Sequence, residues 1–176
     1  VAVSMANELC NAHSLDTIGA GVVIAFAMDL FERGILNQSD TGGLDLGWGN
    51  GEAMEILIRQ MGSGEGFGRI LAQGVREAAR IIGRGAGHYA AHVKGLEMAG
   101  YHPYSMMGTA LGYTVSSRGA DFSDIYATLE YKWLPEKATE VFGTPVSADP
   151  RSIQGKAQLV RRSMIVGSIL DVAGAT

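Results

Sequence analysis

Apolar residues in this chain recur at the period of an α-helix, and a glycine closes almost every segment in which they do so. The first such segment spans residues 17–33, follows Asp16 as a potential N-cap and ends before Gly34. Four apolar residues at four-residue intervals form its inner face: Ile18, Val22, Phe26 and Leu30. Further apolar residues widen this face, which predicts a helix buried on more than one side.

Four more segments have helical periodicity, and no segment shows the alternation that is typical of a β-strand. They span residues 51–61, 66–82, 121–133 and 152–171. We expect Asn50 to cap the segment at 51–61, and we expect Gly62, Gly83 and Gly174 to end three of the four. The pattern therefore predicts an all-α fold, an irregular multi-helix bundle with glycine-rich loops.

The remaining residues have a weaker pattern. Residues 85–119 mix small residues with aromatics, and Pro135, Pro145 and Pro150 indicate a loose linker. The chain has 25 glycines but only 4 prolines, which implies tight turns and close approaches of the backbone. A polar, glycine-rich loop at residues 37–50 is the segment that best suits a bound ligand.

Charge and cysteine content exclude several classes of protein. The net charge of -4 argues against nucleic acid as a partner, since phosphate contacts need clustered Lys and Arg. The single cysteine, Cys10, excludes an internal disulfide and favours an inert buried thiol in a reducing, cytoplasmic setting. No apolar run reaches the roughly 18 residues of a membrane span, and because the sequence opens in apparent mid-helix without a charged n-region, we expect no targeting signal. We expect the chain to be a piece of a longer polypeptide.

The pattern Asp-x-x-Gly occurs twice, at Asp40-Thr41-Gly42-Gly43-Leu44-Asp45 and at Asp171-Val172-Ala173-Gly174-Ala175-Thr176. In each copy a carboxylate precedes a glycine by three residues and a polar residue by five. Backbone N–H groups in a glycine turn can then converge with an acidic side chain on one polar ligand. The alternative is that each copy marks a turn or a helix C-cap.

Other polar residues allow more than one interpretation. His88 and His92 have the i, i+4 spacing of a metal pair, but no third ligand is evident, which favours an ordinary surface pair. Glu97 is a candidate acid or base and, alternatively, a surface partner of Lys94. His102, which precedes a proline, is a candidate for proton transfer or a histidine bonded to backbone.

The segment Arg118-Gly119-Ala120-Asp121 can bind an anion or bridge two helices. The sequence contains no P-loop, no Gly-x-Ser-x-Gly motif and no dinucleotide fingerprint.

Several motifs in one order resemble the aldehyde ferredoxin oxidoreductase family. They are Leu9-Cys10-Asn11 with Leu15-Asp16-Thr17-Ile18, Phe31-Glu32-Arg33-Gly34-Ile35, residues 40–45, Trp48-Gly49-Asn50, Gly66-Phe67-Gly68 with Leu71-Ala72-Gln73-Gly74-Val75, Val93-Lys94-Gly95-Leu96-Glu97, and Ser117-Arg118-Gly119-Ala120-Asp121. The resemblance covers nearly the whole chain. It implies that residues 1–105 are a portion of the family's helical second domain and residues 106–176 the start of its helical third domain.

The resemblance also implies a cofactor. Enzymes of this family hold tungsten, or in some members molybdenum, between two pterins beside a [4Fe-4S] cluster. The two motifs would each bind one pterin, through Asp40, Gly43, Leu44 and Asp45 and through Asp171, Gly174, Ala175 and Thr176. No residue of this chain is expected to ligate the metal, and the cluster ligands are expected mostly outside the chain. Glu97 and His102 are the candidate proton-transfer groups.

This sequence departs from the family pattern at three places. Thr176 stands where a cysteine commonly provides the fourth cluster ligand. Tyr101-His102-Pro103-Tyr104 stands where Tyr-Asp-Pro-Arg is usual, and Phe122 stands where a histidine is frequent. The last two changes put a simple aldehyde substrate in doubt.

The function that the resemblance implies is oxidation of an aldehyde to a carboxylic acid, with ferredoxin or another electron-transfer protein as acceptor. One alternative is a family paralogue that acts on another small molecule, such as an aromatic acyl-CoA reductase subunit. Another is a non-catalytic helical binding module. The expected partners include the remaining domains of the parent chain, and a homodimer stays open. Neither nucleic acid nor a membrane is an expected partner. The isolated 176 residues are expected to be inactive.

Overall fold

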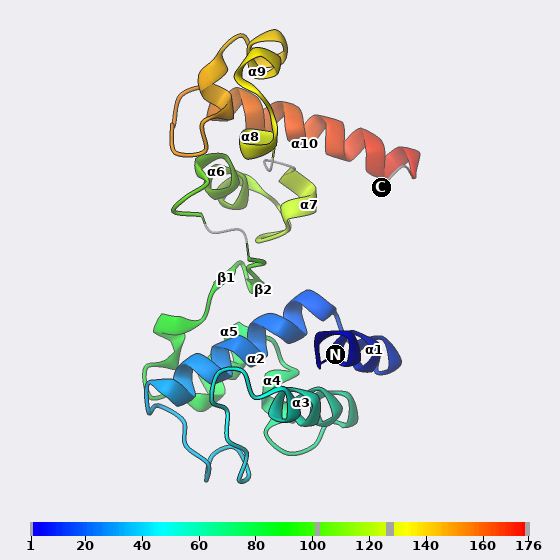
Figure 1. Cartoon of the computed structure of the whole chain (residues 1–176), viewed down its shortest axis with the longest axis vertical. Helices are drawn as coiled ribbons and strands as arrows, with labels where there is room; N and C mark the ends of the chain where they lie inside the picture. The colour runs from blue at the N-terminus through cyan, green and yellow to red at the C-terminus, as the bar shows by residue number, and fades with distance from the viewer. Residues whose placement is uncertain (1, 101–102, 126–128, 175–176) are drawn as a thin grey trace. The chain divides into compact units, whose positions relative to one another are not determined.

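A computed structural model describes residues 2–100, 103–125 and 129–174 (Figure 1). The chain divides into two compact units, Val1–Met98 and Ala99–Thr176. The division falls before the expected boundary after residue 105, and the match of the two units to the family's domains stays a prediction. Helices form nearly all of the regular structure in the described residues, beside two strands of two residues each, which confirms the all-α prediction.

The first unit is organised around one apolar helix, α2 (Thr17–Glu32). Asp16 caps this helix by accepting a hydrogen bond from the Gly19 N–H at 2.5 Å. Val23, Ala27 and Leu30 are at most 1% exposed, and buried residues lie on several sides of the helix, as predicted. α2 is therefore the centre of the unit's core.

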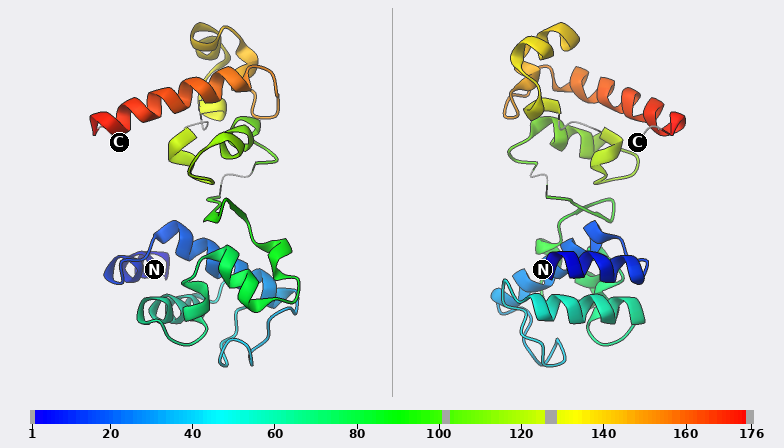
Figure 2. Two further views of the ribbon diagram at one scale, coloured as in Figure 1. Left: turned by 180° about the vertical axis from the view of Figure 1, so that it is seen from behind. Right: turned by 45° about the vertical axis from the view of Figure 1, so that its right-hand side comes forward.

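Shorter elements cover α2. They are α1 (Ala2–Ala12), α3 (Gly51–Ser63), α4 (Gly68–Leu71), α5 (Val75–Ile82), the 3-10 helix η1 (Ala86–Tyr89) and a hairpin of β1 (His92–Val93) and β2 (Leu96–Glu97). α1 lies alongside α3 in both views of Figure 2. The two antiparallel strands pair His92 with Glu97, and the turn between them places Lys94 and Gly95 at positive φ.

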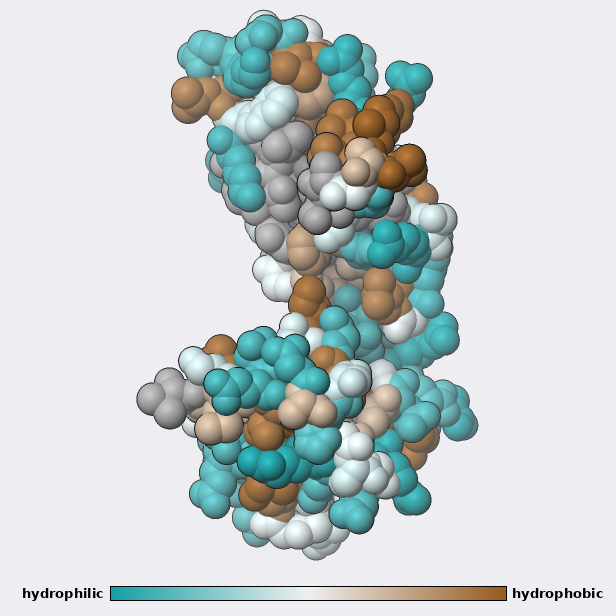
Figure 3. All heavy atoms as spheres, turned by 90° about the vertical axis from the view of Figure 1, so that its right-hand side faces the viewer, coloured by the Kyte–Doolittle hydropathy of each residue, from teal (hydrophilic) through white to brown (hydrophobic). Residues whose placement is uncertain are grey.

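In the second unit, the long helix α10 (Lys156–Ala173) packs against α6 (Met107–Val115) and α7 (Phe122–Ile125). The helices α8 (Leu129–Lys132) and α9 (Pro135–Phe142) pack against the 3-10 helix η2 (Pro145–Ala148). Hydrophobic residues gather on one face of this unit (Figure 3). On α10, Ile165, Val166, Ile169 and Val172 are between 47% and 91% exposed, so the outer half of this helix has an unburied apolar side.

Several predicted helix boundaries were wrong because a glycine there serves a different purpose. Gly62 does not end α3, which continues to Ser63 and is capped by Gly64 at φ 73°. A side chain at Gly62 would clash with the ring of His13, so this glycine permits close packing instead. The predicted helix at 66–82 is two helices, because Gly74 at φ 81° interrupts it.

Other corrections lie in the second unit. The predicted linker with three prolines forms α9 and η2, and Pro135 stands at the first turn of α9, where its missing N–H costs nothing. The helix predicted at 152–171 begins at Lys156, after Gly155 at φ 73°, and ends before Gly174 as expected. The helix predicted at 121–133 is seen as α7 and α8, and residues 126–128 lie outside the described residues.

Within the described residues, no single helix is long and apolar enough to cross a membrane. α1 and α2 pass that test only as a pair, and they are bent by 119° at the break between them.

Candidate functional site

The loop that follows α2 is held in one shape by its own hydrogen bonds. The Gly43 N–H donates to the Gln38 carbonyl at 2.7 Å, and the Asn37 N–H donates to Oδ2 of Asp40 at 3.0 Å. Gly42 and Gly43 have φ angles of 70° and 91°, which favour glycine. The first Asp-x-x-Gly copy is therefore a rigid turn in which the carboxylate of Asp40 orders the backbone before it.

A second segment of the chain fixes the carboxylate of Asp40. Nη2 of Arg84 lies 2.6 Å from Oδ1 of Asp40, and Nη1 donates to Oδ2 at 3.0 Å and to the Ile35 carbonyl at 2.8 Å. The hydrogen bonds from the Arg84 side chain, and then from the Asn37 N–H, hold the pKa of Asp40 below its usual value. Asp40 is therefore an ionised, oriented acceptor.

The role of Arg84 was not predicted from the sequence. The available signal was its position between Gly83 and Gly85, which indicates a tight turn, and Arg84 itself has a φ of 50°, a value that is uncommon for residues other than glycine.

The other residues of this motif have separate roles. Thr41 is buried, and its hydroxyl donates to the Leu44 carbonyl at 2.6 Å. Asp45 is exposed, and its Oδ1 accepts from the Gly47 N–H at 3.0 Å. The Asn50 side chain donates to the Asp45 carbonyl at 2.9 Å and also caps α3, as predicted. Thus hydrogen bonds hold the Asp40 carboxylate in one orientation, whereas the Asp45 side chain is exposed to solvent.

The second Asp-x-x-Gly copy ends α10. Gly174 has a φ of 66°, and its N–H donates to the carbonyls of Asp171 and Leu170. Asp171 is exposed on the last turn of the helix. Here the motif has the geometry of a helix C-cap. Ala175 and Thr176, the other predicted cofactor-binding residues of this copy, lie outside the described residues.

Glu97 caps a helix that is distant in sequence. Its Oε1 accepts from the Val75 N–H at 2.6 Å, at the start of α5, where Gly74 provides no capping side chain. A Cβ at Gly74 would lie 2.8 Å from this oxygen, so only glycine lets the carboxylate approach. The alternative, a surface pair of Glu97 with Lys94, stays a prediction.

Glu97 and Asp16 also line a cavity of about 240 Å³ in the first unit. Its remaining wall is largely apolar and includes Leu15, Val23, Met61 and Leu71. Oε2 of Glu97 and Oδ2 of Asp16 both approach Gly19, so two carboxylates converge on one side of this cavity. His102, the other candidate for proton transfer, lies outside the described residues.

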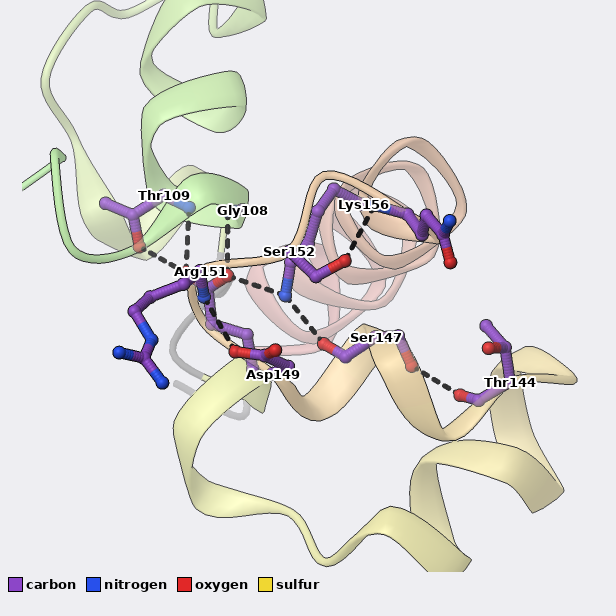
Figure 4. Close-up of polar contacts among 10 residues, drawn as sticks. Gly108, Thr109, Thr144, Ser147, Asp149, Arg151, Ser152 and Lys156 are labelled. Atoms are coloured by element: carbon purple, nitrogen blue, oxygen red, sulfur yellow. Dashed lines mark hydrogen bonds and ion pairs between the residues drawn. The ribbon is translucent and has the colours of Figure 1, made fainter.

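A buried ion pair in the second unit was not predicted from the sequence. Nζ of Lys156 lies 2.9 Å from Oε2 of Glu130, and the two side chains are 3% and 0% exposed. Glu130 accepts from the N–H groups of Gly108 and Thr109 at 2.7 and 3.1 Å, and Lys156 donates to the Ser147 carbonyl at 2.8 Å (Figure 4). The carboxylate thereby caps α6, whose own N-cap residue, Met106, makes no side-chain cap.

The remaining candidates have structural roles. His88 and His92 lie on η1 and β1, not on one helix face, and the described residues contain no group of three His, Cys, Asp or Glu that could hold a metal. Arg118 and Asp121 pair with each other at 2.6 Å, and Asp121 also accepts from the Ser123 N–H at the start of α7. Burial raises the pKa of the Cys10 thiol, as expected for an inert cysteine.

Comparison with known proteins places this arrangement in a family. The family model described as aldehyde ferredoxin oxidoreductase, domains 2 and 3, matches residues 1–175. A tungsten-containing aldehyde ferredoxin oxidoreductase of Pyrococcus abyssi is 33% identical over 174 residues, which are 96% of this chain and 27% of that protein. The chain thus spans about a quarter of the length of the curated relatives it matches.

Two other similar proteins have names that describe enzymes other than an aldehyde oxidoreductase. The WOR-like subunit of an aliphatic sulfonate oxidoreductase of Pyrococcus furiosus is 34% identical over 140 residues, or 76% of this chain and 22% of that protein. The active-site complex BamBC of benzoyl coenzyme A reductase, solved with 1,5-dienoyl-CoA, superposes with a TM-score of 0.54 and 35% identity over 63% of this chain and 17% of that one. By the match of the family model over residues 1–175, this chain belongs to the aldehyde ferredoxin oxidoreductase family.

Proposed function

We propose that this chain is the helical, pterin-binding part of a tungsten-containing oxidoreductase that oxidises aldehydes to carboxylic acids and delivers the electrons to ferredoxin. The observation that carries this proposal is the loop at residues 37–50, where Arg84 orients the carboxylate of Asp40 beside a glycine turn. Its family membership and the tungsten-containing relatives support the same cofactor.

The atoms of this loop suit a pterin ring, which has both N–H donors and ring acceptors. A carboxylate has about four acceptor positions, and the contacts of Asp40 with Arg84 and Asn37 use three. Asp45 is exposed and gives one oxygen to the Gly47 N–H, which leaves its other oxygen for a ligand donor. A flat ring can approach Gly42 and Gly43, because no atom lies within 4 Å of where their Cβ atoms would be.

When bound, the tungsten-pterin group would supply the redox chemistry, and the protein would supply placement, proton transfer and exclusion of water. We propose Asp40, Gly43, Leu44 and Asp45 as the first pterin-binding segment and Asp171, Gly174, Ala175 and Thr176 as the second. Glu97 and His102 remain our candidates for proton transfer, and a [4Fe-4S] cluster would have most of its ligands outside this chain. Glu97 suits this role if the Oε2 atom, which faces the cavity beside Asp16, exchanges the proton.

A second candidate function is reduction of an aromatic acyl-CoA by a paralogue of the same family. The similarity to the benzoyl coenzyme A reductase complex, at 35% identity, favours it, as do the family-atypical Tyr101-His102-Pro103-Tyr104 and Phe122. Turnover of an aldehyde by the full-length gene product supports the first function, and turnover of an aromatic acyl-CoA supports the second.

Elemental and pterin analysis of the full-length gene product tests the cofactor. We expect about one tungsten or molybdenum and two pterins per chain, and Asp40→Ala should lower the pterin content while helicity is retained. Asp29→Ala is a matched control, because Asp29 makes a similar exposed pair with Arg33 on α2, outside the loop. Pterin content that is unchanged in Asp40→Ala would overturn the assignment of this loop, and absence of both metal and pterin would favour a non-catalytic binding module.

A further inference from the structure

Three arginines line one groove of the first unit. Arg76 and Arg80 are one helical turn apart on α5, and Arg84 lies in the turn after this helix, where it lines the same groove. The groove has a volume of about 350 Å³ and is also lined by Gly83, Gly85, Gly87 and His92. We propose that this groove binds the phosphate or diphosphate group of a ligand.

Three glycines that follow α5 also line the groove. Gly83 and Gly85 have φ angles of 66° and 79°, and Arg84 between them is at 50°, so the chain turns sharply there. A Cβ at Gly83, Gly85 or Gly87 would meet no atom within 4 Å. An oxyanion can therefore reach the backbone of this loop.

The arginines keep donors for a ligand. Arg80 uses Nε and Nη2 on Glu77, and in the described part of the chain its Nη1 has no protein partner. Arg76 makes one weak bond, from Nη1 to the Lys94 carbonyl at 3.4 Å. Arg84 is committed to Asp40 and Ile35 and would contribute mainly its charge. Guanidinium groups bind phosphate oxygens in pairs, so Arg76 and Arg80 are the expected direct contacts.

Two carboxylates oppose the three arginines at this groove. Glu77 pairs with Arg80 and also interacts electrostatically with Arg76, and Asp40 pairs with Arg84, so the three arginines exceed the two carboxylates by one charge. Glu77 therefore competes with an incoming anion for Arg80. If the groove is a phosphate site, an anion can replace Glu77 on Arg80. Arginines that serve only to bind carboxylates of the protein would not exchange partners in this way.

A titration of the chain with inorganic phosphate and with pyrophosphate, followed by NMR of the backbone amides, tests the proposal. We expect shifts concentrated at residues 83–87, with tighter binding of pyrophosphate if the ligand carries a diphosphate and similar binding of both probes if it carries one phosphate. Chloride at the same ionic strength is the control for general screening. Equal shifts with chloride would overturn the proposal.

Three variants localise the binding. Arg80 is 72% exposed, so Arg80→Ala should leave the fold intact and weaken phosphate binding by about tenfold or more, the effect of one charged hydrogen bond. Glu77→Gln should tighten binding, because it frees Arg80. Arg59→Ala, at an exposed arginine on α3, should have no effect. If Arg80→Ala binds phosphate as well as Arg59→Ala does, the groove is not the site. The pterin analysis is independent of this result.

Discussion

The buried pair of Glu130 and Lys156 allows a quantitative prediction about stability. Replacing Lys156 with Met keeps the length of the side chain and removes its charge, so the Glu130 carboxylate loses its ion-pair partner at 0% exposure. Removing one partner of a buried ion pair typically costs about 3–5 kcal/mol. The amides of Gly108 and Thr109 still bind the carboxylate, so we expect a cost of about 3 kcal/mol, at the lower end of that range.

Two further variants separate charge from packing. Glu130→Gln combined with Lys156→Met removes both charges, and the double variant should be more stable than Lys156→Met alone. Lys137→Met is the matched control, because Lys137 makes an exposed pair with Glu140 at 2.9 Å. Exposed pairs contribute about 0–1 kcal/mol, so this change should have little effect.

The two tryptophans allow the second unit to be followed by itself. Trp48 lies in the first unit, and Trp133 lies in the second, stacked on Phe142 with ring centroids 5.5 Å apart. In a Trp48→Phe background, urea unfolding followed by fluorescence reports on Trp133 alone. A cost for Lys156→Met no larger than that for Lys137→Met, or a double variant no more stable than Lys156→Met, would refute the reasoning.

Two predictions concern the first unit. Because the pairing with Arg84 lowers the pKa of Asp40, the pair contributes stability above the unfolded-state pKa near 3.8 that is lost as pH falls through the lower folded value. In Asp40→Asn, the urea concentration at the unfolding midpoint, followed by Trp48 fluorescence, should therefore fall less steeply as the pH is lowered. An unchanged dependence of this midpoint on pH would contradict the pairing. Gly74→Ala should lower stability by more than about 1 kcal/mol, because alanine is strained at φ 81° and its Cβ would displace Glu97 from α5. A Gly74→Ala midpoint equal to that of Gly21→Ala, a helical position with open space around it, would show that Glu97 does not need this glycine.

Helices whose signals are local could be predicted from the sequence. Asp16, Asn50 and Gly174 each act within four residues of themselves, and the structure confirms all three as helix caps. The pattern of apolar residues also predicted that α2 is central, because burial on several sides leaves no polar face.

What the sequence could not show depends on partners that are distant along the chain. Gly62 and Gly74 were interpreted as a helix end and a helix interior, because the side chains they accommodate, His13 and Glu97, lie far away in sequence. The pairing of Asp40 with Arg84 spans 44 residues, and no local pattern specifies it. The first motif was therefore found as a candidate site, but its most important contact was not.

The glutamates that cap α5 and α6 lie on the C-terminal side of the helices they complete. In each case the carboxylate is 22 residues beyond the amide it binds: Glu97 beyond Val75, and Glu130 beyond Gly108. On the ribosome, each helix must therefore wait for a later segment to leave the exit tunnel before its first turn is satisfied. Synthesis order thus delays the completion of α5 until the end of the first unit has emerged, and the completion of α6 until α8 has emerged.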